Sequence, residues 1–411
     1  MRFTDKKCLA TMTVGLAIIA AGLGFLVNLR LERYTQGLEG LVVELEPVSL
    51  RETGTRQVQE DEDGFTVLVE VNSSIIVLVK RLSTQAETRD LFFDYASRSS
   101  FTFDGKALAA FHQAVDDADG VARALDELSQ CTEFSVSFYV INGKTARRDF
   151  QSLRFLPLAQ LIDVSARVAI AEGDLGEGLE NALMLFRMAR FMDAGLVPSS
   201  IRYSSSNLCR SVACQLVNDV LSAGLAWPNE QQEQIVSELE KCADFDAHRR
   251  SISADRAWTI ELINTMPIHR IALNGPPCLE YFKGKLTRWD AGVFPKAETK
   301  KAASFLNGDE LPALIESWQA LDLEEARIIC RVRGLRIALA LLAMPEIRTQ
   351  EVDGEELLAS LGIPANLLLD PITGDELRVL KDNGTWRIYS VGVDGVDNHG
   401  DAQSDMSVVT F

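Results

Sequence analysis

The sequence predicts an α+β protein that is mostly α-helical and begins with a transmembrane helix. Three observations support this fold class. An uncharged apolar stretch lies near the N-terminus, apolar residues recur at helical spacing through residues 157–344, and two runs with strand composition lie near the C-terminus. The chain of 411 residues exceeds the size of one ordinary domain, so we expect two lobes and a tail beyond the anchor.

Residues 8–29 form an uncharged stretch of 22 residues, CLATMTVGLAIIAAGLGFLVNL. As a helix this stretch is roughly 33 Å long, which matches the hydrocarbon core of a bilayer. A cleaved signal peptide and a buried core helix are the alternatives, but a signal peptide usually has a shorter apolar core and a small-residue cleavage site. We therefore expect residues 1–35 to comprise a short cytoplasmic tail and an uncleaved anchor in the lipid bilayer.

The basic residues beside the span indicate its orientation. The positive-inside rule favours a cytoplasmic N-terminus by one residue, because three basic residues precede the span and two follow it: Arg2, Lys6, Lys7, Arg30 and Arg33. The rest of the chain would then be the extracytoplasmic body of a single-pass inner-membrane protein. A cytosolic body is the alternative that these flanks leave open.

Residues 36–155 are predicted to form a small α+β lobe. The segments FTVLVEV and IIVLVKRL, within residues 65–82, are rich in β-branched residues and are joined by Asn-Ser-Ser, which predicts a β-hairpin. LVVEL before it and SVSFYVI at 135–141 also have strand composition. A helical stretch is predicted at 106–130, with a break at Gly120.

Residues 156–345 are predicted to form an irregular helical bundle. Apolar residues from Leu158 to Ala169 recur at helical spacing, and Gly173 separates this helix from a second one at 177–194. The pair resembles one helical hairpin of a tetratricopeptide repeat, but the pattern does not return about 34 residues later, so a regular array is not expected. Further helices are predicted at 199–224, 229–242, 248–266, 309–320 and 322–343.

The last of these helices is very apolar, yet we do not expect it to cross the membrane. Four basic residues interrupt it, and charges are costly in lipid. They are Arg327, Arg331, Arg333 and Arg336. The sequence therefore predicts a buried bundle helix rather than a second span.

The composition limits the partners of the protein. The chain holds 59 Asp and Glu against 41 Lys and Arg, a net charge of −18 that repels phosphate backbones and excludes nucleic acid as a partner. Residues 351–411 contribute −9, because they hold 12 acidic and three basic residues. The six cysteines beyond the span mostly lie in apolar helical patterns, which favours buried thiols over disulfides.

The sequence carries no catalytic signature. H-E-x-x-H, C-x-x-C and G-x-S-x-G are missing, and the chain has only four histidines, so we expect a non-enzymatic protein. Two alternatives stay open. One is a membrane-anchored hydrolase that uses a carboxylate pair, and the other is a receptor-like module that binds a ligand in an apolar pocket or patch.

Residues 346–411 are predicted to be an acidic tail with a β-hairpin and an aspartate-rich loop. LRVLK and TWRIYSV have strand composition and flank the turn sequence Asp382-Asn383-Gly384. Carboxylate oxygens on a flexible loop suit a calcium ion, although the spacing does not match an EF-hand. The alternative is a solvated turn whose aspartates bond their own backbone. The candidate metal ligands are Asp394, Asp397, Asp401 and Asp405.

The tail resembles the DPxxG…YSxGxDG ending of the major pseudopilins of type II secretion systems. The resemblance rests on DPITG at 370–374 and YSVGVDG at 389–395. The tail is even more similar to that of uncharacterised membrane-anchored proteins of planctomycetes, which also have an N-terminal span and a long helical middle. The N-terminus lacks the prepilin cleavage signature, so only the tail is similar to the pseudopilins.

This resemblance implies a calcium-binding loop with the four aspartates named above as ligands, and an envelope or secretion-system protein as a partner. With the features of the chain itself, it predicts a membrane-anchored, extracytoplasmic scaffold or interaction protein of the bacterial envelope. Calcium would stabilise its C-terminal loop.

Overall fold

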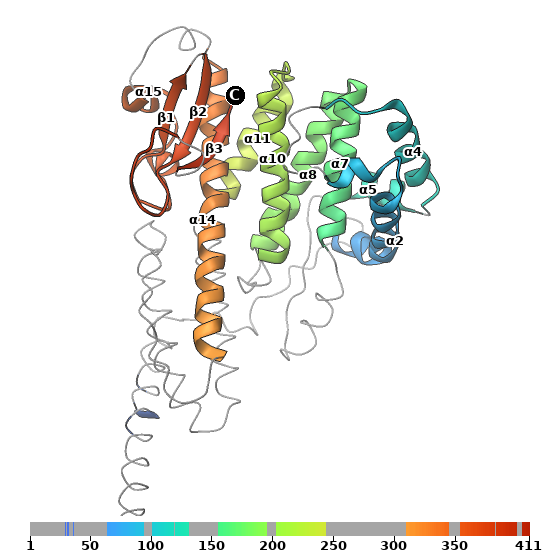
Figure 1. The fold of residues 1–411 in the computed structure, drawn as a ribbon, viewed down its shortest axis with the longest axis horizontal. Helices are drawn as coiled ribbons and strands as arrows, with labels where there is room; N and C mark the ends of the chain where they lie inside the picture. Colours follow the sequence, from blue (N-terminus) through green and yellow to red (C-terminus); the bar gives the residue numbers. More distant parts are fainter. Residues whose placement is uncertain are drawn as a thin grey trace, which may run out of the picture.

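A computed structural model of the protein describes mostly helices that stand side by side, with one three-stranded antiparallel sheet at one end (Figure 1). This confirms the predicted fold class as far as a mostly helical protein with a small C-terminal sheet. Among the described residues, no helix is both long and apolar enough for a membrane span, and residues 8–28 of the predicted anchor lie outside them. The described residues are 29, 31–32, 36, 64–93, 101–118, 120–130, 155–194, 203–243, 310–344, 354–382, 384–400 and 405–411.

A single helix, α2 (Gly64–Thr84), covers the segment for which the sequence predicted a β-hairpin, so that prediction is wrong. No proline or glycine interrupts the segment after Gly64. Its buried residues recur at i, i+3, i+4 and i+7, and the helix packs against other helices along this stripe. Burial of a continuous stripe outweighs the weak strand preference of β-branched residues. The stripe comprises Ile75, Leu78, Val79 and Leu82.

Three further helices complete the described N-terminal group: α3 (Arg89–Phe93), α4 (Gly105–Asp116) and α5 (Val121–Gln130). The last two confirm the predicted helical stretch and its break, because Gly120 between them has a φ of +74°. The predicted strands LVVEL and SVSFYVI lie outside the described residues. The described part of the predicted α+β lobe is therefore helical.

The predicted helical hairpin is confirmed by α7 (Phe155–Glu172) and α8 (Leu175–Ala194). The chain reverses at Gly173, whose φ is +93°. Gly178 lets the two helices approach closely, since a Cβ there would lie 2.4 Å from Cγ1 of Ile170. The first hairpin of the bundle therefore depends on a glycine inside a helix.

The next helices are α10 (Leu208–Ser222) and α11 (Asn229–Cys242), and a short π-helix, η2 (Tyr203–Asn207), leads into α10. The helix predicted at 229–242 is confirmed. The predicted helix at 199–224 is present from Tyr203 onward as η2 and α10, and the one at 248–266 lies outside the described residues.

The central helices form two layers. α7, α10 and α14 (Glu310–Leu342) lie in one layer, while α8 packs on α7, α10 and α11, and α11 packs on α14. α10 begins 53 residues after α7, and α11 begins 54 residues after α8. The result is an irregular array of two layers, because α7 and α8 pack closely on each other whereas α10 and α11 make few contacts.

α14 is one continuous helix, whereas the sequence predicted two helices at 309–320 and 322–343, so that division is wrong. No glycine or proline lies between the two predicted segments, and Pro312 sits in the first turn, where proline is tolerated. The buried position of its C-terminal half is confirmed, since residues such as Ile329 and Ile337 are fully buried. Arg336 pairs with Glu240 of α11 at 2.9 Å.

The described cysteines confirm the prediction of buried free thiols. Cys209, Cys214, Cys242 and Cys330 are all free and buried. Burial raises the pKa of Cys214 to about 12, which keeps it a neutral thiol at physiological pH. The other cysteines lie outside the described residues.

A buried ion-pair cluster connects α7 to α10. Arg167 Nε donates to both carboxylate oxygens of Asp163 at 3.0 and 3.1 Å, and its Nη2 donates to Asp219 at 2.6 Å. Gln215 donates to the other oxygen of Asp219 at 2.8 Å. Burial raises the pKa of Asp219, and the neighbouring Arg167 offsets part of that rise.

Asp219→Asn tests this cluster through the pH dependence of stability. Because the folded pKa of Asp219 is raised, the folded protein binds this proton more tightly than the unfolded chain does. The resulting stabilisation is fully present below the unfolded pKa and is lost as pH rises through the folded pKa. We expect the unfolding free energy of the natural chain, relative to Asp219→Asn, to fall as pH rises from about 4.

Urea denaturation of the full-length chain in detergent measures this difference. Asp90→Asn is the matched control, since the Asp90 side chain is 85% exposed and lies outside the cluster. If the unfolding free energy of the natural chain, relative to Asp219→Asn, rises with pH, the raised pKa of Asp219 in the folded protein is contradicted.

Candidate functional site: the C-terminal sheet and its loop

The C-terminal sheet consists of β1 (Arg378–Asp382), β2 (Thr385–Ser390) and β3 (Met406–Thr410) in the order β1-β2-β3. β1 and β2 confirm the predicted hairpin. β3 was not predicted, and it pairs with the other edge of β2, where Trp386 and Phe411 exchange backbone hydrogen bonds of 2.8 and 3.1 Å. Two short helices precede the sheet, α15 (Gly354–Ser360) and α16 (Ala365–Leu368).

β3 attaches the sheet to the helical array through contacts with α14 and α10. Val408 packs over Gly334 of α14, where a Cβ would lie 2.3 Å from Cγ1 of Val408. On the side of α10, Ser222 Oγ donates to the carbonyl oxygen of Thr410 at 2.7 Å, and the Thr410 N–H donates to Asn218 Oδ1 at 3.4 Å. The sheet thus closes the end of the array that α14 would otherwise expose.

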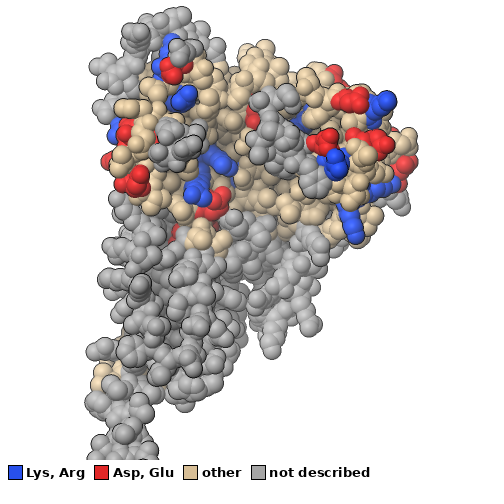
Figure 2. All heavy atoms as spheres, viewed as in Figure 1, with Lys and Arg blue, Asp and Glu red and all other residues tan. Residues whose placement is uncertain are grey.

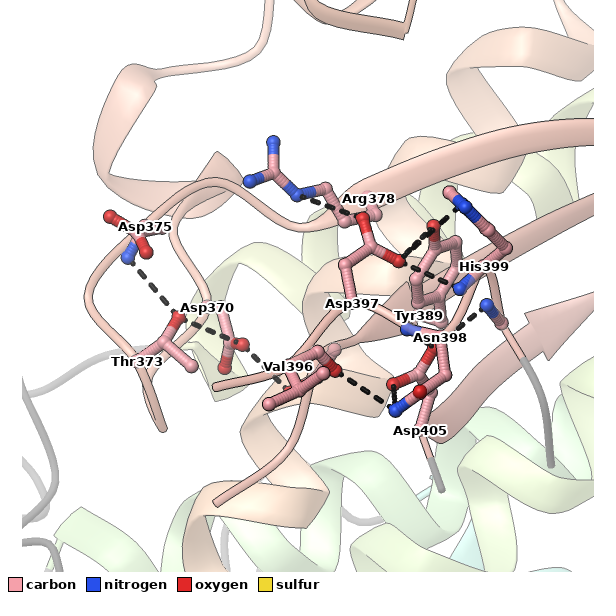
Figure 3. Close-up of polar contacts among 12 residues, drawn as sticks. Asp370, Thr373, Asp375, Arg378, Tyr389, Val396, Asp397, Asn398, His399 and Asp405 are labelled. Carbon is pink, nitrogen blue, oxygen red and sulfur yellow. Dashed lines mark hydrogen bonds and ion pairs between the residues drawn. The ribbon is translucent and has the colours of Figure 1, made fainter. Parts of the chain in front are cut away.

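Asp370 is the centre of the polar contacts beneath the sheet. Its side chain is buried, and its Oδ2 accepts hydrogen bonds from Ser390 Oγ of β2 at 2.7 Å and from Thr373 Oγ1 at 3.1 Å (Figure 3). Its Oδ1 accepts from the Ile372 N–H at 2.8 Å and from Cys330 Sγ of α14 at 3.5 Å. One carboxylate therefore connects the turn, the middle strand and the last helix of the array.

Arg333, one turn further along α14, reinforces this connection. Its guanidinium is buried and donates to the carbonyl oxygen of Leu369, the residue before Asp370. Burial lowers the pKa of Arg333 to about 10, which still leaves it charged at neutral pH. Burial also raises the pKa of the Cys330 thiol well above its ordinary value, and Asp370 adds to that rise. Both effects favour the neutral thiol of Cys330, which donates its hydrogen to Asp370.

The motif that carries the resemblance to pseudopilins has a structural explanation. Gly374 has a φ of +87° and donates its N–H to the carbonyl oxygen of Asp370 at 2.8 Å, which closes the DPITG turn. Gly392, with a φ of +74°, donates its N–H to Ser390 Oγ at 3.0 Å. The two halves of the motif meet where Ser390 donates to Asp370. The motif residues thus hold one another in place.

The aspartates at the start of the loop bond its backbone. Asp394 Oδ1 accepts from the Val396 N–H at 3.1 Å. Asp397 Oδ1 accepts from the Tyr389 hydroxyl at 3.1 Å and from the His399 N–H at 2.8 Å (Figure 3). Burial, together with this hydrogen bond, raises the pKa of Tyr389 to about 12 and keeps its hydroxyl a donor. These contacts match the acidic-turn alternative considered from the sequence.

Asp405 closes the other end of the loop. Its Oδ2 accepts from the Asn398 and Gly400 N–H groups at 3.0 and 2.8 Å, and its Oδ1 accepts from the Asn398 side chain at 3.4 Å. These bonds hold His399 between them at a φ of +58°, which is unusual for a residue other than glycine. The loop conformation therefore depends on a buried carboxylate.

The four predicted calcium ligands differ in their fit to a metal ion. Asp394 and Asp397 are exposed, and each accepts a backbone hydrogen bond through its Oδ1, while Oδ2 of Asp397 pairs with Arg378 Nε at 3.9 Å (Figure 3). Asp405 fits poorly, because it is buried and both its oxygens accept hydrogen bonds. Asp401 lies outside the described residues, within which no group of three metal-binding side chains occurs.

The sequence did not single out Asp370, Cys330, Arg333 or Gly334 for a site. Asp370 belongs to the DPITG turn that the sequence did identify, so an Asp-Pro turn was the available signal. The α14 residues gave none, because their role depends on the sheet lying beside them. Comparisons with known protein families, curated proteins and solved structures gave no match to this chain.

Gly334→Ala tests the attachment of the sheet to α14. The added methyl group overlaps Val408, and such overpacking typically costs about 1–3 kcal/mol. We expect faster hydrogen exchange at the amides of β3 and a lower urea midpoint for the full-length chain. The double variant with Val408→Ala should recover part of the loss, because it removes the opposing methyl groups.

Gly105→Ala is the control for this substitution, since a Cβ at Gly105 meets no atom within 4 Å. It should leave both measurements nearly unchanged. An equal loss at Gly105 and Gly334, or no recovery in the double variant, would show that the close contact between Gly334 and Val408 does not hold the sheet on α14.

Proposed function

We propose that the protein is a membrane-tethered scaffold of the bacterial envelope. The observation that carries the proposal is the fastening of the C-terminal sheet to α14 through Gly334, Val408 and Asp370. This joins the tail and the helical array into one body, which supports a structural role.

The chemistry of the described polar groups supports a structural role. The buried carboxylates of Asp163, Asp219, Asp370 and Asp405 each accept hydrogen bonds from the chain itself. The described cysteines are buried, and burial raises the pKa of two of them, Cys214 and Cys330. These groups stabilise the fold, and we assign them no catalytic role.

The remaining parts of the proposal come from the sequence. Residues 8–29 anchor the protein in the lipid bilayer, with the N-terminus in the cytoplasm and the body outside the inner membrane. The partner is an envelope or secretion-system protein, as the tail resemblance implies. The anchor places the body where such a partner would meet it.

Co-purification of the tagged full-length chain from detergent-solubilised membranes tests the scaffold. We expect one or a few envelope proteins at near-stoichiometric yield after mild chemical cross-linking. An unrelated single-span protein with the same tag controls for non-specific capture. If no protein is recovered above the level of that control, the scaffold proposal is contradicted.

We also propose that calcium stabilises the loop through Asp394 and Asp397, with Asp401 as a further ligand. Because calcium would bind only the folded loop, millimolar calcium should raise the thermal midpoint of the full-length chain, as measured by differential scanning fluorimetry. Asp394→Asn should abolish the rise, while Asp375→Asn, at an exposed aspartate outside the loop, should keep it. An unchanged midpoint in the natural chain would remove the metal from the proposal.

A further inference from the structure

We draw no further inference here: the strongest candidate, the mostly uncharged surface over α10 between the charged surfaces of the sheet and of the α2, α4 and α5 group (Figure 2), is a helix face whose polar side chains already bond within the chain, and nothing in the described part of the structure shows what covers it.

Discussion

The contact between Val408 and Gly334 is the constraint on which the C-terminal half of the structure depends. A strand can approach a helix this closely only where the helix lacks a side chain, since a Cβ at Gly334 would overlap Val408. This approach brings Asp370 within reach of Cys330 and brings Thr410 within reach of Ser222. The tail and the helical array therefore share one core.

Buried charge is the second organising feature. An isolated buried carboxylate is costly, so it must accept hydrogen bonds from donors within the protein, and two of the buried carboxylates do so from several elements. Asp370 draws them from α14, the turn and β2, and Asp219 draws them from α7 and α10. If one donor is removed, the buried carboxylate is left with an unsatisfied hydrogen bond. The elements that meet at Asp370 and Asp219 therefore fit only in this arrangement. Because Asp370 needs these donors, the tail motif at 370–374 and 389–395 stabilises the fold.

The loop after β2 combines local and distant determinants. The turn at Asp394 forms within three residues, through the Val396 N–H. The conformation of His399 needs Asp405, which is near in sequence but is held by β3 and hence by the array. The conformation of the described part of this loop therefore requires the tail to be docked on the array. Asp394 and Asp397 in this part of the loop are exposed.

Local patterns in the sequence determined the elements that need only their own residues. The hairpin of β1 and β2 follows from a turn sequence between two strand-like runs, and α7 and α8 follow from helical spacing around Gly173. The buried cysteines follow from their apolar surroundings. In each case the physical signal lies within about 20 residues.

Tertiary structure alone decided the rest. The segment of α2 has strand-like composition, and only the neighbours that cover its Ile75 and Leu82 stripe make it a helix. β3 is a strand because the free edge of β2 lies beside it, and Gly334 matters because β3 arrives there. Such features depend on residues distant in the chain, and packing chooses among conformations that the local sequence leaves nearly equal in energy.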